Sequence, residues 1–126
     1  MKLNPDCIRD ILLTIENNEF GGYFTLTSLH EKLSKYSIEE LHYCCLKLNE
    51  ADYLDLITIS VLRTHVPGIK AIYDLTFEGH EFLEDIKSDN NWNKTKDIAK
   101  KVGSFSLNTL KDISVEVISS VINSHL

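Results

Sequence analysis

The 126-residue sequence lacks the features that mark membrane-spanning and secreted proteins. No run approaches the roughly 18 to 20 uninterrupted apolar residues that a membrane-spanning helix needs. The N-terminus lacks the charged-then-apolar pattern of a secretion signal. These two absences predict a cytoplasmic protein that does not bind a membrane.

Cysteine is also scarce, and its spacing excludes two kinds of site. The three cysteines are Cys7, Cys44 and Cys45, an odd set with two adjacent members and no C-x-x-C spacing. This set suits neither a disulfide framework nor a structural zinc site. The sequence therefore predicts buried or half-buried thiols, and no metal or other cofactor.

Signatures of catalysis are missing as well. The chain has no Ser-His-Asp set, H-E-x-x-H motif or phosphate-binding loop. His80 begins a His-Glu pair, but position 84 is Glu84 rather than the second His of a zinc protease. His42 beside Cys44 or Cys45 is a poor nucleophile pair, because residues two apart on a helix do not face each other. We therefore expect no enzymatic activity and no small-molecule substrate.

Basic charge is low for a protein that binds nucleic acid. The chain has 13 Lys and Arg residues against 19 Asp and Glu residues, a net charge of −6. Residues 1–90 hold 8 basic and 16 acidic residues, net −8, whereas residues 91–126 hold 5 and 3, net +2. This distribution weakens phosphate binding by the first part and favours a basic protein partner.

The sequence does contain an ordered series of helix signals. Asn4-Pro5-Asp6 supplies a cap, a proline suited to the first helical position and an acid at the positive helix end. Ile8, Ile11 and Ile15 then recur at helical spacing, so a first helix is expected to run to about Asn17.

Two further helices are expected next. Thr27 is predicted to cap a helix that carries Leu29 and ends at about Lys35. Ser37 and Glu40 fit a capping box, in which each side chain accepts the amide hydrogen of the other residue. Two helices separated by a short turn form a helix-turn-helix arrangement.

A change of period after this point predicts a β-hairpin. Residues 54–62 are rich in β-branched and leucine side chains, residues 63–68 end in a Pro-Gly turn signal, and residues 69–75 supply a returning strand. Thr76 is then expected to cap a helix that begins at Phe77. This junction resembles the one between the wing and the last helix of winged helix-turn-helix proteins.

The C-terminal part has a polar loop at residues 88–91, a lysine-rich helix at 92–102 and an apolar stripe after Gly103. The stripe predicts a helix, although its β-branched residues at 113–122 are also compatible with a strand. A second copy of the chain is the simplest cover for so broad a stripe, and packing within the chain is the alternative. The candidate homodimer interface is Leu107, Leu110, Ile113, Val117, Ile118 and Val121.

Several blocks along the chain carry a resemblance to a known family. They are Asp6-x-Ile8-Arg9-x-Ile11-Leu12-Leu13-x-Ile15-Glu16, Glu39-Glu40-Leu41-x-Tyr43 with Leu48-x-x-Ala51, Leu75-Thr76-x-x-Gly79-His80-x-Phe82-Leu83, Trp92-x-Lys94-x-Lys96 and Gly103-Ser104-Phe105-Ser106-Leu107. With them the chain resembles a domain-of-unknown-function family of small proteins encoded by prophages and mobile elements of Gram-positive bacteria. The resemblance implies a winged-helix fold, phage-related regulation in the host cytoplasm and no enzymatic activity. Asp52 stands where winged-helix proteins often have Gly after the third helix, so a different helix end is expected there.

Together these patterns predict an α+β, mainly α fold. Residues 1–90 are expected to form a winged helix-turn-helix domain with a two-stranded β-hairpin wing, and residues 91–126 a C-terminal helical extension that dimerises. The leading hypothesis is a non-catalytic, phage-type regulator that binds DNA or controls transcription. The alternative is an acidic winged-helix protein that binds and inhibits a host or phage protein, as an antirepressor or anti-defence factor. The candidate DNA contacts are Ser37, His42, Tyr43, Lys47, Arg63, His65 and Lys70, and a solvated acidic surface is the plainer interpretation of the third helix.

Overall fold

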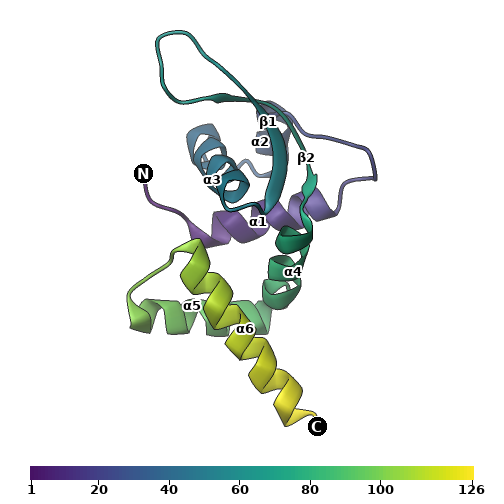
Figure 1. Ribbon diagram of the computed structural model, residues 1–126, viewed down its shortest axis with the longest axis vertical. Coiled ribbons are helices and arrows are strands. Elements are labelled where there is room, and N and C mark those ends of the chain that lie inside the picture. The colour runs from purple at the N-terminus through teal and green to yellow at the C-terminus, as the bar shows by residue number, and fades with distance from the viewer.

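The computed structural model describes residues 1–126 and contains six helices and one two-stranded antiparallel sheet (Figure 1). This confirms the predicted α+β, mainly helical class. None of the helices has the length and apolar character required to cross a membrane. In chain order the elements are α1 (Pro5–Glu16), α2 (Leu26–Lys32), α3 (Ile38–Glu50), β1 (Leu54–Ile59), β2 (Gly68–Leu75), α4 (Phe77–Ile86), α5 (Asp89–Val102) and α6 (Leu107–Ser124).

Helix α1 runs across the middle of the molecule, with α2, α3 and the hairpin on one side and α4, α5 and α6 on the other (Figure 1). It begins as predicted, because the Asn4 side chain accepts hydrogen bonds from the amides of Asp6 and Cys7. Its buried stripe includes Ile8 and Ile11, which belong to a core of 24 buried residues. Complete burial of each such side chain contributes about 1.5–3 kcal/mol to folding. The buried stripe of α1 is therefore a major source of the stability of the fold.

Helix α2 differs from the sequence-based prediction at both ends. Its cap is Thr25 rather than Thr27, since Thr25 accepts from the Ser28 amide and Ser28 accepts from the Thr25 amide. The helix ends at Lys32 rather than at about Lys35. The predicted start was wrong because both threonines are capping residues and only the Thr25 position has a reciprocal partner three residues on.

Only half of the capping box predicted for α3 forms. Ser37 Oγ accepts from the Glu40 amide at 3.1 Å, as expected. The Glu40 carboxylate instead accepts from Asn4 Nδ2 at 3.2 Å, which links the starts of α1 and α3. A tertiary hydrogen bond has replaced the local one.

The predicted hairpin is present, with Leu54 opposite Leu75 and Ile59 opposite Gly68. Strand β1 ends at Ile59 rather than at residue 62, because residues 60–67 form an irregular loop in which Arg63 adopts a left-handed φ of 66°. A short bridge between Phe24 and Ile72, with both backbone hydrogen bonds at 2.8 Å, connects the segment before α2 to β2. The sheet is thereby tied to the segment that leads into α2.

The turn between α3 and β1 is held against the start of α4. Asp52 adopts a φ of 64°, so it takes the left-handed conformation that Gly usually supplies, and the expected departure at this helix end does not occur. Thr76 Oγ1 donates to the Asp52 carbonyl oxygen at 2.6 Å and caps α4 by accepting from the Gly79 amide at 3.0 Å. Thr76 therefore fulfils its predicted role and also joins two turns.

The C-terminal helices correct two further expectations. Residues 89–91 form the first turn of α5 rather than a loop, because Ser88 caps the helix by accepting from the Asn91 amide. Residues 107–124 form one helix, capped by Ser106, so the strand alternative is wrong. Gly103, at a φ of 85°, supplies the left-handed turn between α5 and α6.

Helices α5 and α6 pack on the rest of the chain through a shared core. Trp92 and Ala99 belong to the same apolar cluster as α1. Leu107, Leu110 and Val117 are 8%, 1% and 6% exposed, so they are covered within the monomer. Leu107 and Leu110 are therefore not available to the predicted dimer interface. Val117 keeps only a small exposed part, and Ile113, Ile118 and Val121 remain half-buried.

Candidate macromolecule-binding surface

Helix α3 and the hairpin lie side by side, and their exposed side chains form the surface called here the α3–hairpin face (Figure 1). His42 connects the two elements, since its Nε2 lies 2.8 Å from the Pro67 carbonyl oxygen. A carbonyl only accepts, so this contact requires the hydrogen to be on Nε2. His42, predicted as a DNA contact, is thus occupied in holding the hairpin loop against α3.

The only lysine of α3 is neutralised by its neighbours. Lys47 Nζ forms an ion pair of 2.9 Å with Glu50 and lies 5.6 Å from the centre of the Tyr43 ring. The hydrogen bond to Glu50 raises the pKa of Lys47 above its ordinary value. The structure thus brings the predicted contacts Tyr43 and Lys47 together, with Glu50 as an added partner.

Carboxylates dominate the remaining charge on α3. Glu39 and Glu50 are exposed, and Glu40 is half-buried near Asn4. Ser37 Oγ, another predicted DNA contact, is the acceptor that caps the helix. This helix therefore presents net negative charge to solvent.

The outer part of the hairpin, between Asp55 and Asp74, has the opposite charge. Residues 56–73 contain no Asp or Glu. The predicted contacts Arg63, His65 and Lys70 are exposed and form no ion pair within the chain. These cations are therefore free to meet an acidic group on a partner.

The hairpin also exposes apolar side chains that the sequence-based prediction did not identify. Leu62 is 93% exposed at the loop. The other exposed aliphatic residues of the hairpin are Ile57, Ile59, Val61 and Val66. The sequence did offer a signal for this exposure, because the loop between the two strands contains Val61, Leu62 and Val66. Their exposure depends on the hairpin extending past the core.

Groups able to perform chemistry do not gather at this face. The three cysteines are free and buried, as predicted, and burial raises the pKa of the Cys45 thiol. The structure holds no group of three or more His, Cys, Asp or Glu residues arranged to hold a metal ion. The α3–hairpin face thus combines an acidic helix with exposed aliphatic side chains on the hairpin.

Comparison with known proteins places the chain in a family. Residues 2–106 match a family described as "Hypothetical protein (DUF2513)". The chain belongs to this family. It is also 32% identical, over 124 residues, to an uncharacterised protein of Haemophilus influenzae, and the match covers 97% of this chain and 99% of the relative. No solved structure matches it.

The match confirms that the chain belongs to a family of unknown function. It begins before α1 and ends just before α6, so it contains the whole α3–hairpin face and α5. The relative comes from Haemophilus influenzae, so the family is not limited to the Gram-positive bacteria in which the resemblance placed it.

Proposed function

We propose that this member of the DUF2513 family is a non-catalytic winged-helix regulator that binds a protein partner through its α3–hairpin face. The winged-helix assignment is supported by the element order, in which a helix-turn-helix pair leads directly to a two-stranded hairpin and then to a capped helix. The Phe24–Ile72 bridge supports it further, because it fixes the hairpin to the segment that leads into α2.

One observation carries the choice of a protein partner: the hairpin exposes five aliphatic side chains next to a helix whose only lysine is paired. A DNA-binding helix needs cations that displace counterions from phosphates, and Lys47 is already neutralised by Glu50. A protein interface instead has an apolar centre within a polar rim. Leu62, at 93% exposure, is the natural centre of such an interface.

The charges of the face define the partner's chemistry. The partner should offer an apolar pocket for Leu62, an acidic group near Arg63 and a basic group opposite Glu39. A partner with a basic surface of this kind is itself suited to binding nucleic acid. Binding of this kind would inhibit a host or phage factor that acts on nucleic acid, as an antirepressor or anti-defence protein does.

DNA binding is a second candidate because the outer part of the hairpin, residues 56–73, contains no Asp or Glu. Arg63 and Lys70 are exposed and unpaired, so they are able to contact phosphates or a minor groove. In this case the hairpin rather than α3 would supply most of the contacts.

The test compares Leu62→Asp with Val102→Asp. Val102 is also exposed and aliphatic, but it lies at the end of α5 away from the hairpin, so it is a matched control. Cell proteins captured by the wild type would be identified by mass spectrometry, and each would be purified and titrated against all three forms. For a protein partner we expect Leu62→Asp to weaken binding by about 2 kcal/mol or more, roughly thirtyfold in Kd. Val102→Asp should bind like the wild type.

A mobility-shift titration with operator-region DNA at low salt distinguishes the second candidate. The leading proposal predicts no shift. A shift that weakens steeply with salt and disappears in Arg63→Ala/Lys70→Ala would contradict it and favour DNA.

A further inference from the structure

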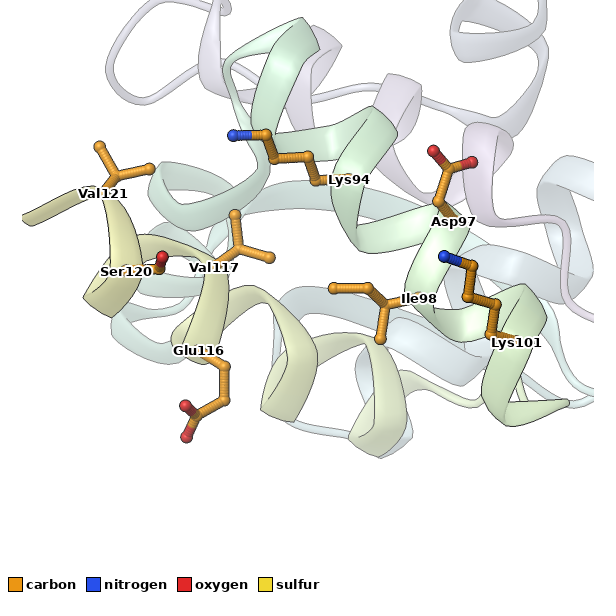
Figure 2. A pocket seen from close by; sticks show the side chains of 8 residues that line it. All are labelled: Lys94, Asp97, Ile98, Lys101, Glu116, Val117, Ser120 and Val121. Carbon is orange, nitrogen blue, oxygen red and sulfur yellow. The ribbon is translucent and has the colours of Figure 1, made fainter. Parts of the chain in front are cut away.

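A groove between α5 and α6 lies at the end of the molecule away from the hairpin (Figure 1). Its volume is about 380 Å³. Lys94, Ile98 and Lys101 line it from α5, and Glu116, Val117 and Val121 line it from α6. In Figure 2, Ile98 and Val117 point toward one another across the groove. The groove therefore has an apolar floor and charged edges.

The charged edges have both signs, and neither sign is neutralised within the chain. Lys94 and Lys101 share one face of α5 with Ile98, because the three residues are four and three positions apart. Asp97 also lines the groove on α5, beside the lysines. Neither lysine forms an ion pair within the chain, and neither Asp97 nor Glu116 on the opposite wall forms one. An occupant that bears both an acid and lysines would complement these edges.

The second half of α6 supplies the apolar part of such an occupant, while Glu116, Lys94 and Lys101 of the same chain supply the charges. It projects beyond α4 and α5 toward the C-terminus (Figure 1). From Val117 to Leu126 it contains no Asp, Glu, Lys or Arg. Ile122 is 54% exposed, and Ile118 and Val121 are half-buried. A projecting, uncharged helix with exposed aliphatic residues gains free energy when a groove covers it.

We propose that two copies of this chain form a two-fold symmetric dimer in which the projecting half of α6 of each copy lies in the α5–α6 groove of the other. In a two-fold interface the same patch serves both copies, so the patch must complement itself. This requirement is met here, because the groove and the projecting half of α6 are next to each other on the same chain. Each copy's Glu116 then faces Lys94 and Lys101 of the other copy.

This interface differs from the one predicted from the sequence. It retains Val117, Ile118 and Val121, adds the lysine face of α5, and leaves out Leu107 and Leu110, which are covered within the monomer. It uses a different surface from the α3–hairpin face. The dimer proposal therefore does not depend on the partner-binding proposal, and each can fail without the other.

A charge-swap series on the full chain tests the dimer. Sedimentation equilibrium over a concentration series should show a monomer–dimer equilibrium for the wild type. Glu116→Lys should raise the dimer Kd by about tenfold or more, because it places like charges opposite one another. Adding Lys94→Glu and Lys101→Glu to that variant should restore a Kd within about threefold of the wild type, since the pairs are re-formed with exchanged signs. Asp112→Lys makes the same charge change at an exposed position of α6 that does not line the groove, and should leave the Kd unchanged.

The apolar floor is tested separately by Val121→Asp, which should also abolish the dimer. Circular dichroism checks that each variant is folded, and Ile122→Asp replaces any Val121→Asp protein that unfolds. A wild type that stays monomeric at its highest soluble concentration overturns the proposal. So does a dimer whose Kd is unchanged by both Glu116→Lys and the aspartate variant, or one that the triple charge swap does not restore.

Discussion

The Trp92 indole Nε1 donates a 2.9 Å hydrogen bond to Oδ1 of Asp6, which joins the first turn of α5 to the first turn of α1. The same carboxylate oxygen accepts from Lys96 Nζ at 2.9 Å. Burial by itself would raise the pKa of Asp6, but the hydrogen bonds from Lys96 and Trp92, with the charge of Lys96, lower it below its ordinary value. The C-terminal helices are therefore held to α1 by a polar contact as well as by apolar packing.

This contact predicts a pH dependence for Asp6→Asn. A carboxyl with a lowered folded-state pKa stabilises the fold above its unfolded pKa, near the ordinary value of 3.8, and loses that effect as pH falls through the lower folded value. Asp6→Asn should therefore be less stable than the wild type at pH 7, and the gap should close below about pH 4. Because the Asp6 side chain is 55% exposed, the difference should be below about 1 kcal/mol. Urea unfolding at pH 7, 5 and 3 measures it. Asp97→Asn, at a carboxylate without an ion pair, is the control, and an equal pH dependence in both variants would count against the contact.

Gly79→Ala should destabilise the fold severely. A Cβ at this position would lie 2.0 Å from the Tyr53 carbonyl oxygen, and a backbone atom cannot move aside as a flexible side chain can. We expect a loss of about 3 kcal/mol or more, at the upper end of overpacking effects. Gly103→Ala is the comparison, because its Cβ would meet no atom within 4 Å and its cost comes only from the positive φ of 85°. That cost should be about 1 kcal/mol. Denaturant unfolding of both variants measures the difference, and equal losses would show that α4 is not held so close to Tyr53.

Asp52→Gly should stabilise the protein. Asp52 adopts the left-handed conformation after α3, and Gly adopts it without the steric cost of a Cβ. Its carbonyl still accepts from Thr76 after the substitution, since this bond uses only the backbone. We expect a gain of about 0.5–1 kcal/mol in denaturant unfolding. Ala51→Gly, one residue earlier in a right-handed conformation, should lower stability instead. A loss in both variants would mean that the Asp52 side chain stabilises this turn.

The thiols should be unreactive in the folded protein. Cys7, Cys44 and Cys45 are all fully buried, so a reagent does not reach them. Burial also raises the pKa of Cys45, whereas the hydrogen bond with Cys7 lowers the pKa of Cys44, so the protection of Cys44 rests on its lack of access. Ellman's reagent at pH 8 should react with no thiol on the time scale of mixing in buffer, and with all three in denaturant. Rapid reaction of a thiol in buffer would show that α3 opens readily from α1.

Local signals in the sequence predicted most helix starts because a cap depends on residues only three apart. Asn4, Ser37 and Thr76 each cap the helix expected of them. The same local logic was wrong at Thr27, where two threonines competed. It was incomplete at Glu40, whose carboxylate found a partner in Asn4 on another helix.

The candidate surface was less predictable than the fold. The predicted DNA contacts lie on α3, at its cap Ser37, or on the hairpin and its loop, and their role stays a prediction. The sequence did not show that Lys47 is paired with Glu50 or that His42 is occupied by Pro67. Those pairings depend on side-chain rotamers and on how close the hairpin loop comes to α3. Residue spacing in the sequence predicts neither.

The sequence by itself determined the mainly helical class, the hairpin, the burial of the thiols and the acidic character of the first 90 residues. Each follows from short-range periodicity, capping chemistry or composition. Only the tertiary structure decided which part of the α6 stripe is covered within the chain and which part projects. It also decided that five aliphatic side chains of the hairpin face solvent, while others, such as Leu54 and Ile72, are buried. An apolar residue shows the same preference for burial wherever it occurs, and only the packed arrangement of the elements determines whether the chain itself covers it.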